Sequence, residues 1–431
     1  MKPLFTAALV IVMLLSACTP PPDLTPLQTA VTTHKARLAA SLASGDFGQA
    51  VRQAITTSPT MGRGEASLRE AEAGLLAEGG AFLPQISLGL SPQDSGGFAI
   101  TSFGAISQLI YDGGASKARK TAAQARVLAG LAGRLDAGSK AALSAIDAWS
   151  SVATTRALLE VSEASLASLE ATTSQVEERS LGGLGSSVDA LTAQSRLAND
   201  RAAVVAARSE ASRAEAIFIE TFGQLPAPDL SFPPQAPPAP AEGAAESPML
   251  HVAEAELLAA QAEHAAALAA RVPSLSFRVS AIPGEQATTG LSSEQLLAPS
   301  RGRAARLAAT QARIDARQVD LDATKRELES RSRILAAELL AVADRLTATS
   351  AAREANRANL EVAHEQFQAG RRSLIELLDA EREALASERQ QILAEHDQVM
   401  LGYAVLAATG DILDVFGVTL PAKTVSGQVS E

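Results

Sequence analysis

The sequence is poor in the residues that build disulfide scaffolds and compact globular cores. Its 431 residues include one cysteine, and aromatic residues make up only 3%. A single cysteine excludes an intramolecular disulfide framework. Ordinary cores are filled to crystal-like density by large side chains, whereas alanine is the commonest of the residues that make up the 47% hydrophobic content here. Because alanine favours helices that pack closely along their length, the composition predicts long packed helices.

Positive charge and long apolar runs are also scarce. The chain has 37 basic and 48 acidic residues, a net charge of −11, which argues against nucleic acid as a partner because such binding requires Lys and Arg to neutralise phosphates. Beyond the first 18 residues no apolar run is long enough for a transmembrane helix. The five histidines never lie three or four residues apart, and no zinc or nucleophile-elbow spacing occurs. We therefore expect neither an enzyme nor a bound metal or cofactor.

The N-terminus has the pattern of a secretory signal peptide over residues 1–17. Met1-Lys2-Pro3 supplies a short basic region, and the apolar run Leu4 to Leu15 is too short to span a bilayer. Leu15-Ser16-Ala17-Cys18 resembles the bacterial lipobox. The resemblance implies cleavage before Cys18, a covalent lipid on that cysteine, and sorting to the outer membrane because Thr19 rather than Asp follows. The alternative is a plain signal peptide with an incidental cysteine.

The chain repeats itself once. Ser58-Pro59 recurs as Ser247-Pro248, and the strand-like run Leu83 to Leu88 recurs at the same offset as Val272 to Phe277. Internal repeats of this kind indicate duplicated structural units. The predicted organisation is a signal peptide (1–17), a lipidated N-terminal tether (18–45), a first repeat (46–223), a proline-rich connector (224–247), a second repeat (248–417) and a tail (418–431).

Both repeats have the same predicted order of elements. The first begins with a helix over 46–80, continues with two strands between 82 and 111, and ends with a long helix over 115–180 and a shorter one over 186–222. The alternation of Ile86, Leu88 and Leu90 with polar or small residues indicates a strand. The second repeat has weaker strands, expected over 274–282 and about 292–298. At 1.5 Å per residue, the long helix forms a rod of about 100 Å, which no compact domain could contain.

The last helix carries two apolar series with a period of seven. One contains Leu378, Leu385, Ile392, Val399 and Leu406, and the other contains Ala380, Ser387, Ala394, Leu401 and Ala408. A strict seven-residue period indicates coiled-coil packing. The two series lie roughly 200° apart around the helix, which predicts a neighbour on each side, and helices packed in this way form a curved wall that closes into a tube. The alternative is a helix surface of small residues.

Several motifs together resemble one family. The strand entry Leu83-Pro84-Gln85-Ile86-Ser87, the turn Ile110-Tyr111-Asp112-Gly113-Gly114 and the run from Phe367 to Glu381 are similar to those of the TolC family of outer-membrane efflux and secretion channels. The resemblance covers residues 46–417. It implies a mainly α fold with a small β part: long antiparallel coiled-coil helices forming a trimeric α-barrel tunnel, and a 12-stranded outer-membrane β-barrel with four strands per protomer. One departure is Pro299-Ser300-Arg301-Gly302, which replaces the usual aromatic-Asp-Gly-Gly turn.

The resemblance also implies a function and partners. The chain would be a homotrimer anchored in outer-membrane lipid and extending into the periplasm, a passive conduit of a tripartite efflux or type I secretion system. Its partners would be a periplasmic adaptor (membrane fusion protein) and an inner-membrane transporter. The rival interpretation is a lipid-anchored periplasmic coiled-coil scaffold or adaptor without a pore, which would not need Pro84 and Pro273 at the same place in both repeats.

The site residues implied by the resemblance lie at the two turns between long and short helices. The turns themselves would contact the adaptor, and they comprise Gly182, Gly183, Leu184, Gly185, Gly370, Arg371 and Ser373. Asp189 and Arg372 match positions whose ion pairing keeps the channel aperture closed. Glu376 and Asp379 match positions whose carboxylates point into the aperture. The alternative for these two acids is a solvated acidic stripe, which they would share with Glu383.

Overall fold

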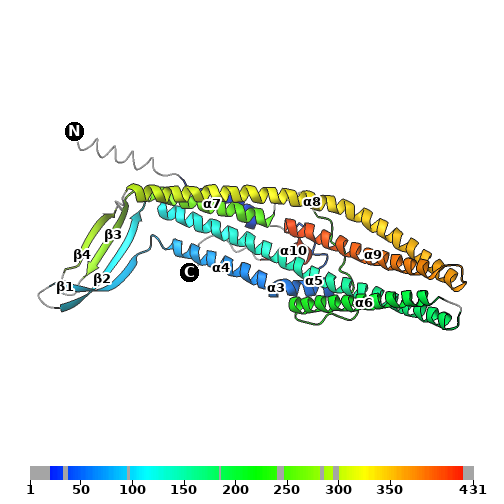
Figure 1. The fold of residues 1–431 in the computed structure, drawn as a ribbon. Helices are drawn as coiled ribbons and strands as arrows, with labels where there is room; N and C mark the ends of the chain where they lie inside the picture. The colour runs from blue at the N-terminus through cyan, green and yellow to red at the C-terminus, as the bar shows by residue number, and fades with distance from the viewer. Residues whose placement is uncertain are drawn as a thin grey trace.

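The computed structural model describes residues 20–32, 37–94, 98–183, 186–239, 247–281, 286–294 and 300–420. The predicted signal peptide and Cys18 lie outside these ranges. The described chain is elongated, with a small β-sheet at one end and two helical turns at the other (Figure 1). None of the helices in these ranges is both long and apolar enough to cross a membrane.

The first repeat contains α3 (Asp46–Thr57), α4 (Pro59–Gly79), β1 (Gln85–Asp94), β2 (Phe98–Tyr111), α5 (Ala115–Leu181) and α6 (Ser187–Phe222). The predicted order is confirmed, but the prediction of one helix over 46–80 is wrong. Ser58 is extended and its hydroxyl caps α4 by accepting the backbone N–H of Thr60. The break follows from Pro59, which lacks a backbone N–H and disfavours a helical residue before it.

The second repeat contains α7 (Pro248–Ala269), β3 (Ser274–Ala281), β4 (Thr288–Glu294), α8 (Ser300–Gln368), α9 (Leu374–Thr409) and the short α10 (Ile412–Val415). The last strand was predicted over about 292–298, but it begins four residues earlier, at Thr288; residues 295–298 lie outside the described residues. Its hairpin partner fixes the register, because Ser280 lies opposite Thr288 and Phe277 lies opposite Leu291. The hydroxyls of Ser280 and Thr288 are 2.7 Å apart, and this pair holds the N-terminal end of β4.

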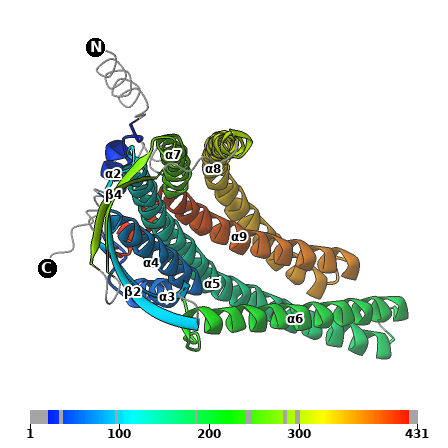
Figure 2. The same ribbon diagram turned by 90° about the vertical axis from the view of Figure 1, so that its left-hand side faces the viewer.

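The helices form a wall one layer thick near the sheet and two hairpins at the far end. Along the wall α4 packs on α5, α5 on α7 and α7 on α8. Further from the sheet, α5 and α6 form the first hairpin and α8 and α9 form the second, and both run to the same end of the molecule (Figures 1 and 2). Because α9 packs against both α8 and α5, the predicted two neighbours of the last helix are confirmed. Members of both predicted series are buried: Leu378, Val399 and Leu406 from one, and Ala380, Ser387 and Ala394 from the other.

The four strands form one antiparallel sheet in the order β1-β2-β3-β4. Pairing of β2 with β3 joins the two repeats. Residues directly opposite one another share a face of the sheet, so the register can be read as two faces. One carries most of the large apolar side chains: Ile86, Leu88, Leu90, Ile106, Phe277, Val279 and Leu291. The other is mainly polar, with Gln85, Ser87, Ser107, Ser276, Arg278 and Ser292, and it also carries Phe103 and Leu109.

The largest core lies in the middle of the molecule and joins the two repeats. It gathers side chains from α3, α5, α6, α9 and α10. Its centre is aromatic: the Trp149 ring meets Phe47 edge-on at 5.2 Å, and Tyr403 stacks on Phe416 at 6.2 Å. Phe218 is almost fully buried and packs on Trp149 at 5.7 Å. Aromatic side chains bury large areas, and six of the chain's aromatic residues gather in this core, where the two repeats are joined.

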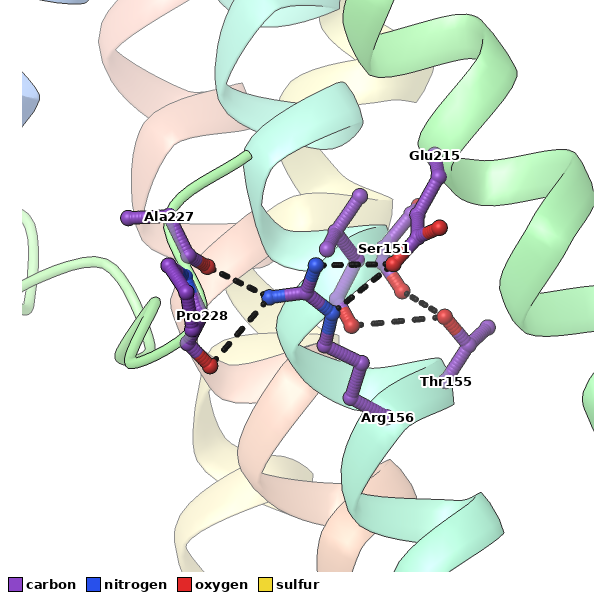
Figure 3. Close-up of polar contacts among 7 residues, drawn as sticks. Ser151, Thr155, Arg156, Glu215, Ala227 and Pro228 are labelled. Atoms are coloured by element: carbon purple, nitrogen blue, oxygen red, sulfur yellow. Dashed lines mark hydrogen bonds and ion pairs between the residues drawn. The ribbon is translucent and has the colours of Figure 1, made fainter. Parts of the chain in front are cut away.

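The described part of the proline-rich connector is extended and lies on this core. The Arg156 side chain on α5 donates to the carbonyl of Ala227 at 2.6 Å and pairs with Glu215 on α6 at 2.7 Å (Figure 3). The Tyr403 hydroxyl donates to the carbonyl of Pro234 at 2.8 Å. The connector therefore binds the helices along its described length.

The segment before α3 is also packed. Helix α2 (Thr25–Thr32) buries Leu27 and Val31 against side chains of α4, α5 and α7. The Arg37 guanidinium then pairs with the fully buried Asp411 at 2.8 Å. The described residues between Cys18 and the first repeat are thus docked on the helical wall and on the C-terminal end of the fold.

Candidate functional site: the two helical tips

Each hairpin ends in a tight glycine turn. We call residues 182–186 the first tip and residues 369–373 the second tip. At the first tip, Gly183 has a positive φ of 73° and its N–H donates to Ser180 at 3.1 Å, while the Ser186 hydroxyl accepts the Val188 N–H and begins α6. A positive φ is strained for residues with a Cβ, which explains the glycine. Leu184 and Gly185 lie outside the described residues.

The second tip combines a C-terminal and an N-terminal helix cap. Gly370 has a φ of 65°, its N–H donates to Phe367, and the Arg371 N–H donates to Gln366 at 2.8 Å, the hydrogen-bond pattern of a Schellman motif. Ser373 then caps α9: its hydroxyl accepts the Glu376 N–H, and its own N–H donates to the Glu376 carboxylate at 2.9 Å. This reciprocal capping box satisfies two otherwise unpaired donors. The tip is therefore a well-defined turn.

The capping box gives Glu376 a structural role in addition to its predicted one. The hydrogen bonds from the backbone and side chain of Ser373, with a smaller contribution from the charge of Arg372, hold the pKa of the Glu376 carboxyl below its usual value. Hydrogen bonds to the charged form have this effect. Glu376 is exposed, so it carries a full negative charge at the tip at neutral pH.

The remaining predicted aperture residues are close to the tips but are not paired with one another within the protomer. Asp189 lies in the first turn of α6, where a negative charge favours the helix N-terminus. Asp379 pairs with Arg382 at 3.3 Å on the exposed side of α9. Among the described residues no ion pair joins Arg372 to Asp189. The geometry of one protomer therefore places these charges at the same end without testing their role in an assembly.

The two hairpins touch one another just above the tips. The Arg179 guanidinium of α5 lies 5.2 Å from the centre of the Phe367 ring of α8 and donates to the Gln368 carbonyl at 3.5 Å. Beside this contact is a small apolar cluster of Leu169, Val176, Ala193, Ala363, Phe367, Leu374, Leu377, Leu378 and Ala380, which we call the tip cluster. It contains side chains from α5, α6, α8 and α9, so all four helices meet there.

One functional candidate at the edge of the tip cluster was missed from the sequence. Glu381 on α9 is only 9% exposed and accepts hydrogen bonds from Ser168 and Thr172 of α5. The signal was present, because Leu374, Leu377, Glu381 and Ala384 lie on one helical stripe, spaced three and four residues apart. Glu381 was missed because it belongs to neither of the two period-seven series, which begin at Leu378 and Ala380.

Comparison with known proteins identifies the family. The family model described as "Outer membrane efflux protein" matches residues 50–223 and 240–410, and these two matches correspond to the two repeats. Comparison with curated protein sequences gives no significant match.

Similar solved structures share the fold. The outer membrane protein VceC of Vibrio cholerae has a TM-score of 0.76 at 18% identity, over 84% of this chain and 96% of that one. The outer-membrane channel MtrE of Neisseria gonorrhoeae, in its open state, has a TM-score of 0.74 at 16% identity over 89% and 95%. The outer-membrane channel CmeC of Campylobacter jejuni has a TM-score of 0.71 at 12% identity over 88% and 87%.

These findings decide between the two interpretations of the sequence. The predicted fold class, long antiparallel helical hairpins with a small β part and an internal repeat, is confirmed. The scaffold without a pore is not favoured, since family and fold are those of channel proteins of the outer membrane. With its family model matched over both repeats, the chain belongs to the outer membrane efflux protein family, the TolC-like family that its motifs resemble.

Proposed function

We propose that this chain forms a homotrimeric channel that exports cargo passively through the outer membrane, together with a periplasmic adaptor and an inner-membrane transporter. The observation that carries the proposal is the sheet at the end of the helical wall. One face is apolar and largely exposed, with Leu88 at 85%. The opposite face is mainly polar, although Phe103 and Leu109 also lie on it. An apolar face suits contact with lipid and a polar face suits a water-filled interior.

The sheet also supports the trimer. It ends at the unpaired edges of β1 and β4. Within a bilayer, unpaired backbone groups have no water to bond to, so spanning strands must close on themselves. Four strands are too few, since barrels of a single chain begin at eight. Three protomers joined edge to edge would give twelve strands and leave no free edge.

The helical wall supports a tunnel with distinct inner and outer sides. A groove of about 800 Å³ runs between α4, α5 and α7, and it is lined by small and charged side chains including Gly130, Arg126 and Glu256. Helix α2 covers Leu128, which lies about 200° from Arg126 around α5. We assign the groove to the inner side. Two of its charges are paired across helices, Arg126 with Glu263 and Glu256 with Arg317 at 2.9 Å. Its apolar lining consists of alanine, glycine and one valine, so this groove presents only small apolar side chains to cargo.

The tips are proposed to meet the adaptor and to narrow the channel. Exposed aliphatic side chains flank both tips, with Leu181 at 90% and Val188 beside the first and Ile375 beside the second. Exposed apolar side chains at the same end of the molecule suit contact with a protein partner. Three copies of Glu376 and Asp379 would place six carboxylates at the end of the tunnel, which favours cations.

A covalent lipid on Cys18 is the proposed anchor. The lipobox-like sequence supports it, and the docked α2 begins at Thr25, so a short segment connects the lipid to the outer side of the wall. Mass spectrometry of the mature N-terminus should give a diacyl- or triacylglyceryl cysteine. An unmodified N-terminus at another residue would exclude the anchor and leave the channel proposal intact.

Planar-bilayer recording of the purified protein tests the channel. We expect discrete conductance steps with cation preference at low ionic strength, where charges are screened least. The double variant Glu376→Gln with Asp379→Asn should reduce that preference, whereas Glu354→Gln, an exposed acid on α8, should not. Arg372→Ser with Asp189→Ala should raise conductance if the two residues restrain the closed aperture. A trimer that inserts into the bilayer but never conducts would contradict the channel proposal and favour the scaffold without a pore.

A further inference from the structure

Two sets of polar contacts with the same arrangement join the two hairpins, and we call each set a polar connection. In each, a titratable side chain of α9 lies within hydrogen-bond distance of two α5 hydroxyls that are four residues apart. In the connection nearer the middle of the molecule, His396 lies 2.8 Å from the Ser150 hydroxyl and 3.2 Å from that of Thr154. These distances are those of ordinary hydrogen bonds.

The connection nearer the tips has the same plan and poorer geometry. The Glu381 carboxylate lies 3.3 Å from the Ser168 hydroxyl and 3.4 Å from that of Thr172. Its third contact is with Nε2 of His364 on α8, also at 3.4 Å. A carboxylate that is 9% exposed and borders the apolar tip cluster thus has long hydrogen bonds. Burying a charge that is incompletely paired is costly, so this is the weaker of the two connections.

We propose that Glu381 is the positioning residue that sets how firmly the two hairpins are held together beside the tips, and that uptake of one proton by the Glu381–His364 pair tightens this contact. The α5–α9 contact would then loosen from the tip end first, while the His396 connection and the aromatic core hold the middle. The predicted consequence for conductance rests on the proposed channel function, whereas the predicted change in the α5–α9 contact is independent of it.

The electrostatic surroundings support a single shared proton. Burial raises the pKa of Glu381 above its usual value, the Ser168 and Thr172 hydroxyls lower it less, Asp200 of α6 raises it and Arg196 of α6 lowers it. Burial lowers the pKa of His364. Among the described residues, α5 faces Glu381 with its two hydroxyls, α6 with Arg196 and Asp200, and α8 with His364. Burial therefore favours the neutral carboxylic acid and the neutral imidazole, so the proton that the pair takes up belongs on Glu381.

The sign of the pH effect follows from these shifts. Separation of the hairpins would expose Glu381 and return its pKa to the ordinary range, so the joined state binds the proton more tightly. By linkage, the joined state gains stability as the pH falls through the raised pKa and loses that gain as the pH rises above it. His364 acts in the opposite sense, because a second proton would charge a half-buried imidazole. The contact should therefore be tightest in mildly acidic solution.

Hydrogen exchange of the purified full-length protein tests the contact without requiring conduction. Backbone amides of residues 374–385 are followed at about pH 7.5 and about pH 5.5, with rates corrected for the intrinsic effect of pH. We expect protection to be about threefold or more higher at the lower pH, within the limit of tenfold per pH unit set by one proton. Glu381→Gln keeps the side-chain shape and cannot titrate, so its protection should not rise at the lower pH.

The control is Glu383→Gln, which removes the same charge from an exposed position two residues further along α9. It should keep the pH dependence of the unaltered protein. Equal protection at the two pH values in the unaltered protein, or a rise in protection at the lower pH that survives in Glu381→Gln, would overturn the proposal. In planar bilayers, conductance should fall with acid in the unaltered protein and stay constant in Glu381→Gln. A protein that fails to conduct but shows the expected exchange would refute the channel and support the contact.

Discussion

The middle of the molecule and its tips are held together in different ways. The middle has a core of fully buried aromatic side chains, including Tyr403, Phe218 and Phe416, contributed by both repeats. The tip cluster is smaller, has one aromatic residue, Phe367, and borders a buried carboxylate. Close packing of large side chains fixes one arrangement, whereas a small cluster with an incompletely paired charge is easier to separate. The difference suggests a rigid middle that supports tips able to move.

The largest expected effect comes from removing an aromatic anchor of the middle. Phe218→Ala should destabilise the fold by about 3–5 kcal/mol, the usual cost of a large aromatic cavity. Thermal unfolding followed by circular dichroism would measure it as a lower melting temperature. Leu377→Ala, at a fully buried position of the tip cluster, is the matched variant: it should speed hydrogen exchange mainly in residues 374–385. If both variants lowered the melting temperature alike and neither acted locally, the contrast between middle and tips would be wrong.

The aromatic core also shows what the sequence could not predict. The order of elements, the repeat and the two neighbours of α9 follow from local patterns, namely prolines, glycines and a period of seven. Phe47, Trp149 and Tyr403 are brought together by contacts between residues far apart in the chain, and no local pattern records such pairings. Helix periodicity identifies Glu381 as a polar residue on an apolar stripe. The α5 hydroxyls that donate hydrogen bonds to it cannot be identified until the packing of the two hairpins is known.

The next effect concerns the ion pair between Arg37, which precedes α3, and Asp411, which follows α9. Asp411 is fully buried, pairs with Arg37 and accepts the Thr409 hydroxyl at 2.5 Å. Asp411→Ala would leave the partly buried Arg37 guanidinium without this partner. Breaking a buried ion pair costs about 3–5 kcal/mol of folding free energy. Because Arg37 is partly exposed, we expect a loss near the lower end of that range. Chemical denaturation would measure the loss. Glu329→Ala, which breaks the exposed pair with Arg333, should change stability by about 0–1 kcal/mol.

A smaller effect is expected at the N-terminus of α9. Ser373→Ala removes the hydroxyl of the capping box, and loss of an N-cap costs about 0.5–2 kcal/mol. The change should appear as faster exchange in the first turn of α9, with the middle core unaffected. Ser373→Asp, which retains a good capping group, should restore most of the protection. Equal exchange in the alanine and aspartate variants would mean that packing, and not capping, holds this turn.

The smallest effect is a pH dependence opposite in sign to that of Glu381, five residues earlier on the same helix. Hydrogen bonds from Ser373 lower the pKa of Glu376 below the usual 4.5, so its contribution to the second tip is present above that value and is lost as the pH falls through the lowered pKa. The Ser373 amide, which donates to this carboxylate, should therefore lose exchange protection in acid below about pH 4. Glu376→Gln should show weaker protection without this acid step. A Ser373 amide equally protected across the acid range would show that the capping box does not depend on the charge of Glu376, and the two glutamates would then differ in burial alone.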